Sequence, residues 1–179
     1  TAGIASSVTT ITNNGVPGES DTVSLTSGVD SGSSFKTGAG NDTFNALLTT
    51  DNTNTLGAYD VIDGGTGTDT LNVDIRTGVT PKTLTSIENL NATFSGAVTL
   101  GLGQASDTTT VKNISSTTAA IFSGLGSQVA NLGVENVASL ATTFTYGSTS
   151  GTQSKSVTLD NVTGGANAAV VIEGIETLT

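Results

Sequence analysis

The chain has 179 residues, contains no Cys, Met, Trp or His, and carries a formal net charge of −10. Without His or Cys it lacks the commonest general base and the thiol nucleophile, and its acidity disfavours nucleic-acid binding because phosphates would be repelled. No run of 18 apolar residues occurs, so we expect no transmembrane segment. Thr, Val and Gly are abundant while strong helix formers are scarce, which predicts an all-β fold.

Acidic residues dominate the first part of the chain. We expect residues 1–36 to form N-terminal solenoid rungs. Between Glu19 and Asp74 there are nine acidic residues and a single base, Lys36. Such a stretch repels itself when folded unless a cation lies between the carboxylates. The alternative is a solvated acidic surface that favours solubility. Asp21 begins an Asp-x-apolar unit that is out of register with the aspartates that follow.

Residues 37–72 contain a nine-residue repeat. An aspartate recurs at every ninth position, at Asp42, Asp51, Asp60 and Asp69. The segments TGAGNDTFN (37–45) and GGTGTDTLN (64–72) nearly match the nonapeptide G-G-x-G-x-D-x-U-x, in which U is large and apolar. One apolar residue in nine, beside a glycine-rich half-turn, is neither helix nor hairpin periodicity. The pattern predicts a coil of short strands and turns.

This segment resembles the RTX family of secreted bacterial proteins, whose repeats form a parallel β-roll. The resemblance covers residues 37–72 well and the rest loosely. It implies an all-β parallel β-roll or β-helix solenoid with Ca²⁺-binding glycine-rich turns. Two nonapeptides form one turn in that family, so the resemblance implies that residues 18 apart stack. Asp42 would then lie against Asp60, and Asp51 against Asp69.

The resemblance further implies two calcium sites, one between loops 38–42 and 56–60 and one between loops 47–51 and 65–69. Carboxylates and backbone carbonyls are the oxygen ligands that calcium takes. The implied residues are Gly38, Gly40, Asp42 and Asp60 for the first ion, and Asp51, Gly65, Gly67 and Asp69 for the second. Each site pairs one loop that matches the nonapeptide with one that differs from it, since loop 46–51 has no glycine. Without an ion, these would be glycine turns carrying solvated aspartates.

Residues 73–179 alternate apolar and polar side chains, which predicts a β-helix-like region of half-buried strands. An apolar–Glu–polar–apolar phrase recurs around Glu88, Glu135 and Glu176. These Glu residues are either ligands or assembly contacts, or simply the exposed residues of strands whose neighbours point inward. Similar phrases accompany RTX-type repeats in bacterial S-layer proteins and large adhesins. We also expect stacked Thr and Asn side chains to pair from rung to rung.

Resemblance and composition together imply a structural segment of a secreted, calcium-dependent, self-assembling protein of the bacterial cell surface, as in an S-layer. Its partners would be calcium and other copies of the same protein. The alternative is a calcium-binding RTX module of an adhesin, or of a secreted enzyme or toxin. We expect no catalysis within this chain, because a Ser nucleophile would lack a His partner and no G-x-S-x-G motif occurs. Paired carboxylates could serve a glycosidase, but sugar sites usually add aromatic side chains, which are few here.

Overall fold

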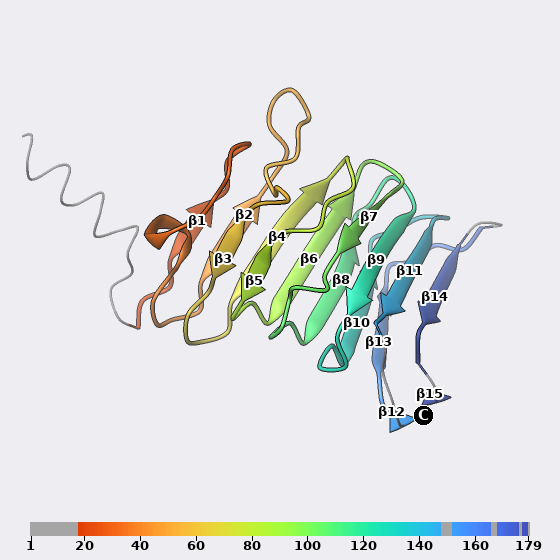
Figure 1. Ribbon diagram of the computed structural model, residues 1–179. Coiled ribbons are helices and arrows are strands. Elements are labelled where there is room, and N and C mark those ends of the chain that lie inside the picture. Colours follow the sequence, from red (N-terminus) through yellow and green to blue (C-terminus); the bar gives the residue numbers. More distant parts are fainter. Residues whose placement is uncertain (1–17, 148–151, 166–167, 176, 179) are drawn as a thin grey trace, which may run out of the picture.

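Short parallel strands stack one above another along the length of the molecule in the computed structural model (Figure 1). The structure describes residues 18–147, 152–165, 168–175 and 177–178. These residues contain β-strands, a short 3₁₀-helix (η1, Ser33–Phe35) and no α-helix. The prediction of an all-β parallel solenoid is therefore confirmed.

Two parallel sheets form the main walls of the solenoid. The larger has seven strands in the order β1-β2-β4-β6-β8-β10-β13. They span Thr22–Ser24, Thr43–Ala46, Thr70–Ile75, Asn89–Phe94, Thr110–Ile114, Asn131–Glu135 and Ser156–Asp160. The second wall has the order β14-β11-β9-β7, whose strands span Ala169–Glu173, Ala141–Tyr146, Ala120–Leu125 and Val98–Gly101.

Two small sheets complete the described strands. One pairs β3 (Val61–Asp63) with β5 (Thr83–Thr85), and a bridge from Leu84 to Ala105 extends it by one rung. The other pairs β12 (Thr152–Gln153) with β15 (Thr177–Leu178). A full turn of the coil therefore crosses the seven-stranded wall, the four-stranded wall and a narrow third side.

Alternation along each strand builds the core. In β4 and β6 every second residue is buried, and the residues between them face outward. Leu71, Val73 and Ile75 point inward from β4 and pair in register with Leu90, Ala92 and Phe94 of β6. Side chains of one kind therefore stack along the solenoid axis, as the two-residue period of a strand requires.

The outward face carries the polar ladder expected from the sequence. Asn72 donates from Nδ2 to Asn45 Oδ1 at 3.0 Å, and Asn91 donates to Asn72 Oδ1 at 3.0 Å. These residues face one another because β2, β4 and β6 pair in parallel register. Rung-to-rung pairing of Asn side chains is thus confirmed.

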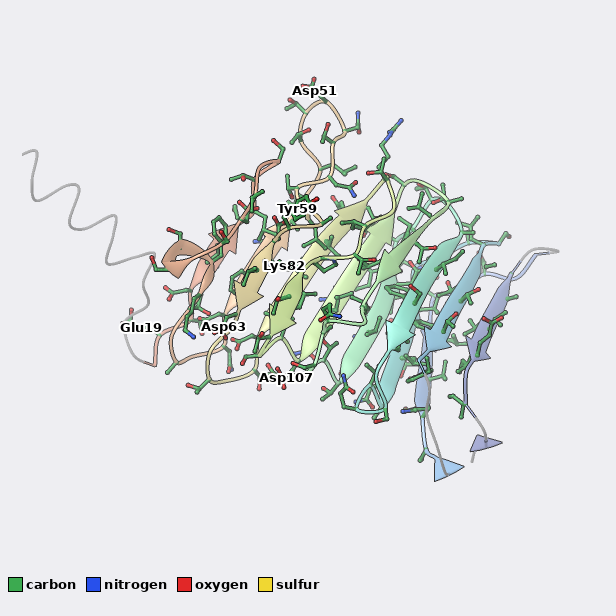
Figure 2. All side chains as sticks on the ribbon, viewed as in Figure 1. Glu19, Asp51, Tyr59, Asp63, Lys82 and Asp107 are labelled. Carbon is green, nitrogen blue, oxygen red and sulfur yellow. The ribbon has the colours of Figure 1, made fainter. Side chains whose placement is uncertain are left out.

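The rung that begins with β2 is longer than its neighbours. Asp42 and Asp69 occupy equivalent positions 27 residues apart, whereas 21 residues separate Asp21 from Asp42. The additional length is a loop after β2 that projects from the body of the solenoid, with Asp51 at its tip (Figure 2). Residues 47–60 form turns but no strand. The loop closes on itself through the hydrogen bond from Thr49 N to Thr53 O at 2.9 Å.

Candidate metal centre

Four acidic residues lie in one column where successive strands of the seven-stranded wall begin. Asp21, Asp42, Asp69 and Glu88 immediately precede β1, β2, β4 and β6. The backbone N–H of each of the three aspartates donates to the carboxylate of the next rung. Asp21 N lies 2.7 Å from Asp42 Oδ1, Asp42 N lies 2.7 Å from Asp69 Oδ1, and Asp69 N lies 2.7 Å from Glu88 Oε2. We call these four residues the carboxylate column.

Each aspartate of the carboxylate column keeps one oxygen unpaired. The Oδ2 atoms of Asp21, Asp42 and Asp69 are buried and have no hydrogen-bond partner. An unpaired buried oxygen of a charged group is among the costliest features a fold can hold. These oxygens therefore need a proton or a cation that the protein itself does not supply.

The pKa values of the column reflect this environment. Burial is the main reason that the pKa of the Asp69 carboxyl is raised to about 6. The charges of Asp42 and Glu88 also raise it, while the hydrogen bond from Asp42 N–H partly offsets them. Burial, followed by the charges of Asp42 and Glu19, raises the pKa of Asp21. The fold thus disfavours the charged forms of Asp21 and Asp69.

The two glycine-rich loops lie directly against each other beside the column. Gly40 N donates to Thr66 O at 2.9 Å, and Thr66 N donates to Gly38 O at 2.9 Å. Gly67 has φ +140°, and a Cβ added there would overlap the carbonyl oxygen of Gly40. A Cβ on Gly65, where φ is +83°, would overlap Gly38 O. Only glycine permits this approach of two backbones.

A second acidic pair lies on another side of the coil. Asp60 precedes β3, and its Oδ1 and Oδ2 accept from Asp30 N at 2.9 Å and Gly57 N at 2.7 Å. Both carboxylate oxygens of Asp30 accept from Thr26, one from its N–H and one from its hydroxyl. Burial raises the pKa of Asp60. Because every oxygen of this pair has a donor, the pair stabilises turns and offers no unpaired oxygen to an ion.

The implied pairing of residues 18 apart is wrong. Asp42 is in register with Asp69 and not with Asp60, and Asp51 lies exposed at the tip of the projecting loop (Figure 2). The reason is the glycine-free segment 46–51, which lacks the glycine turn of the motif and leads into the loop that projects from the coil. The two loops that match the motif therefore stack on each other. Gly38, Gly40, Asp42, Gly65, Gly67 and Asp69 come together, while Asp51 and Asp60 lie elsewhere.

Two members of the column were not predicted as site residues. Asp21 and Glu88 occupy the same position as Asp42 and Asp69. The signal in the sequence is an acidic residue two positions before a core residue. Asp21-x-Val23 and Glu88-x-Leu90 both carry it, although neither fits the nine-residue register.

The recurrent Glu phrase does not mark one structural position. Glu88 joins the carboxylate column, whereas Glu135 ends β10 and forms an ion pair with Lys112 at 2.7 Å on the outer face. Glu176 lies outside the described residues. The phrase therefore fits two different local structures, in which the apolar neighbours Ile87 and Val134 are buried.

The available oxygen donors are of the chemical type that a hard cation prefers, but their arrangement supplies only part of a coordination shell. Carboxylate oxygens and peptide carbonyls are the ligands calcium prefers, and the unpaired Oδ2 atoms of Asp42 and Asp69 provide two of them. Among the residues that the structure describes, no three or more His, Cys, Asp or Glu side chains gather closely enough to hold a metal ion. Any ion beside Asp42 and Asp69 would therefore complete its shell with carbonyl oxygens and water.

Comparison with known proteins adds no relative: no family model, curated protein or solved structure matches the chain. The described residues also contain no helix that is long and apolar enough to cross a membrane.

Proposed function

We propose that this chain is a calcium-stabilised structural segment of a secreted protein that assembles on the bacterial cell surface, in the manner of an S-layer. The observation that carries the proposal is the row of buried, unpaired Oδ2 atoms of Asp21, Asp42 and Asp69. Burying such oxygens destabilises the fold unless a cation is present, so the residues are better explained as ligands than as structural acids.

Calcium fits this role for two reasons. The available donors are all oxygens, and the stacked loops 37–41 and 64–68, whose carbonyls are further oxygen donors, directly precede Asp42 and Asp69. Calcium accepts irregular shells of six to eight oxygens, including water, whereas magnesium demands near-octahedral geometry. Affinities of roughly 10⁻⁴–10⁻³ M are typical of extracellular modules and would match a secreted protein.

The surface-assembly part of the proposal is supported by the shape and charge of the chain. A solenoid of stacked rungs presents long flat walls and two ends, which suits a repeating array. The net charge of −10 keeps neighbouring copies apart until cations neutralise it. Catalysis forms no part of the proposal.

The decisive experiment for calcium is thermal unfolding, followed by circular dichroism, in millimolar calcium, in millimolar magnesium and with excess chelator. We expect the melting temperature to rise with calcium and less with magnesium. At ten times the dissociation constant, one site contributes about 1.4 kcal/mol. Identical melting curves in calcium and in chelator would contradict the proposal.

Matched variants test the assignment of the ligands. Asp42→Asn should lose most of the stabilisation by calcium, because it removes a charge from the carboxylate column. Asp51→Asn makes the same change on the exposed loop and should retain the full calcium response. If both variants respond to calcium alike, the ligands lie elsewhere.

The surface-assembly part needs the full-length protein. Electron microscopy of purified protein and of cell surfaces, with and without calcium, should show an ordered array only with calcium. A monomer at millimolar calcium, or a hydrolase domain on the same polypeptide, would favour the module of an adhesin or secreted enzyme instead.

A further inference from the structure

The last strand of the seven-stranded wall exposes residues that face the core in the rung before it. Val157 and Leu159 of β13 pair in register with Leu132 and Val134 of β10. Leu132 and Val134 are buried, but Val157 is 39% exposed and Leu159 is 58% exposed. Among the described residues no further rung covers β13. Val157 and Leu159, which lie in the row that faces the core in other rungs, are therefore exposed to solvent.

An apolar cavity opens beside these side chains. It is lined by Val134, Leu140, Leu159, Val162, Ala168 and Val170, together with Ala169. In the second wall, β14 likewise follows β11 in parallel register, and its inward-row residues Val170 and Ile172 are only partly buried, whereas their partners Thr142 and Phe144 in β11 are fully buried. The C-terminal rung is thus patterned to receive another rung on top of it.

The first described strand has the matching pattern. Asp-Thr-Val-Ser-Leu (21–25) and Lys-Ser-Val-Thr-Leu (155–159) alternate polar and apolar residues in the same order. Both segments occupy the same rows of the seven-stranded wall, because each strand pairs in parallel with the next. Placed after β13, β1 of another copy would set Thr22 beside Ser156 and Val23 beside Val157.

Charge distinguishes the two ends. Asp21 begins the carboxylate column, and Lys155 stands at the same position before β13. The Lys155 ammonium donates to Ser127 O and Val129 O, both at 2.8 Å, in the rung below. In interior rungs the column carboxylate accepts the N–H of the preceding rung, as Asp42 does from Asp21. A second copy would therefore bring the Asp21 carboxylate to a position that carries a base.

From register, apolar exposure and charge we infer that two copies of this chain stack head to tail, with β1 of one copy extending the seven-stranded wall after β13 of the other. This inference deepens the self-assembly in the proposed function by naming its interface. The interface is heterologous, so repeated stacking produces a filament rather than a closed dimer.

Cysteine cross-linking tests this geometry directly, because the chain has no cysteine of its own. Thr22→Cys and Ser156→Cys are outward-facing and exposed changes at the two strands that would pair. Mixing the two single variants under mild oxidation should give a disulfide-linked heterodimer. Thr110→Cys, in the middle of the same wall, replaces Thr22→Cys as the control and should give at least ten-fold less cross-linked product with Ser156→Cys.

A second pair of variants tests the apolar contact. Leu159→Lys should abolish concentration-dependent association in sedimentation velocity, because it places a charge at the end face. Leu47→Lys changes an equally apolar residue, 51% exposed on the projecting loop, and should associate like the unmodified chain. Circular dichroism shows whether both variants remain folded.

Three results would overturn the inference: monomers at every concentration, dominant disulfide-linked homodimers of the Ser156→Cys variant, or equal loss of association in the two Lys variants. The experiment is run both in calcium and in chelator. Cross-linking without any effect of calcium on melting would reject the calcium proposal and retain head-to-tail stacking. Calcium-dependent melting without cross-linking would retain the calcium proposal and reject head-to-tail stacking.

Discussion

Asp69 shows how strongly one residue of the carboxylate column depends on its surroundings. Its side chain is fully buried, one oxygen is bonded to Asp42 N–H, and the other has no partner. The pKa of its carboxyl is raised from 3.8 to about 6. Because the folded state binds the proton more tightly than the unfolded state, ionisation of Asp69 destabilises the metal-free protein.

The sign of this shift predicts the pH dependence of stability without calcium. Between about pH 4 and pH 6 the folded protein holds more protons, so the free energy of unfolding should fall as pH rises through that window. The raised pKa values of Asp21, Asp60 and Asp74 act in the same direction, whereas the pKa of Asp63, which despite burial is lowered by the Lys36 ammonium, acts in the opposite direction. Chemical denaturation in chelator at pH 4.5 and pH 7 measures the difference, and higher stability at pH 7 would contradict it.

Asp69→Asn isolates the contribution of the buried charge. Asn keeps the acceptor for Asp42 N–H and removes the ionisable group. We expect the metal-free variant to be more stable at pH 7 by on the order of 1–3 kcal/mol, and to lose its response to calcium. Asp51→Asn, exposed on the projecting loop, should change neither quantity. An Asp69→Asn variant destabilised in chelator would show that the charge is structural.

Gly67 is the residue on which loop stacking depends most directly. Gly67→Ala places a Cβ against Gly40 O at a positive φ, so we expect a loss of roughly 2–4 kcal/mol in unfolding free energy. Gly38→Ala is the matched control, since its Cβ would meet nothing within 4 Å. Denaturant titration should place Gly38→Ala within about 0.5 kcal/mol of the unmodified chain.

At the scale of elements, three phenylalanines connect successive rungs in the core. Phe94 and Phe122 meet edge to face with ring centroids 5.2 Å apart, and Phe122 and Phe144 stack with centroids 5.1 Å apart. All three are fully buried. Phe122 therefore contacts an aromatic neighbour on each side and holds β9 against both adjoining rungs.

Truncation of Phe122 should destabilise the solenoid strongly. For Phe122→Ala we expect a loss of roughly 3–5 kcal/mol, because the change leaves a cavity between two packed rings. Ile121→Ala, one residue earlier and 37% exposed on the outer face, should lose less than about 1 kcal/mol. Equal effects in equilibrium unfolding would mean that β9 does not face the core as described.

Composition and strand periodicity predicted an all-β fold of half-buried strands, because the two-residue alternation directly sets which side chains are buried. The parallel solenoid was predicted from the resemblance of residues 37–72 to RTX repeats. The stacking register was not predictable from a nine-residue count. Two rungs stack where their backbones can approach closely. Gly40 and Gly67 allow this approach, whereas the glycine-free segment 46–51 does not. Asp21 and Glu88 were missed for the same reason: neighbouring rungs differ in length, so equivalent positions have no constant spacing.

At the scale of the whole molecule, the described residues form a linear stack in which each rung contacts only its neighbours, so the stability of a rung depends on how many of its sides are covered. All residues of β13 are exposed, whereas β6 and β8 lie between two strands and bury alternate residues. Local opening should therefore begin at the C-terminal rung.

Hydrogen exchange measured by mass spectrometry tests this gradient. Amides of residues 156–160 and 169–173 should exchange roughly ten-fold or more faster than those of residues 89–94 and 110–114. If the chain stacks head to tail, the difference should shrink as protein concentration rises. Uniform protection along the chain at low concentration would contradict the gradient.

The projecting loop gives the solenoid a place where its sequence can change in length. Thr49 and Thr53 close the tip, and Thr55 Oγ1 donates to Leu47 O at 2.8 Å across the base, so the loop holds its own shape. Asn54 ties the base to the next turn through Thr77 O at 2.7 Å. We therefore expect residues added between these contacts to leave the stacking of β2 on β4 unchanged. In the surface array proposed above, this loop would be the site for inserting a displayed epitope or a grafted binding peptide.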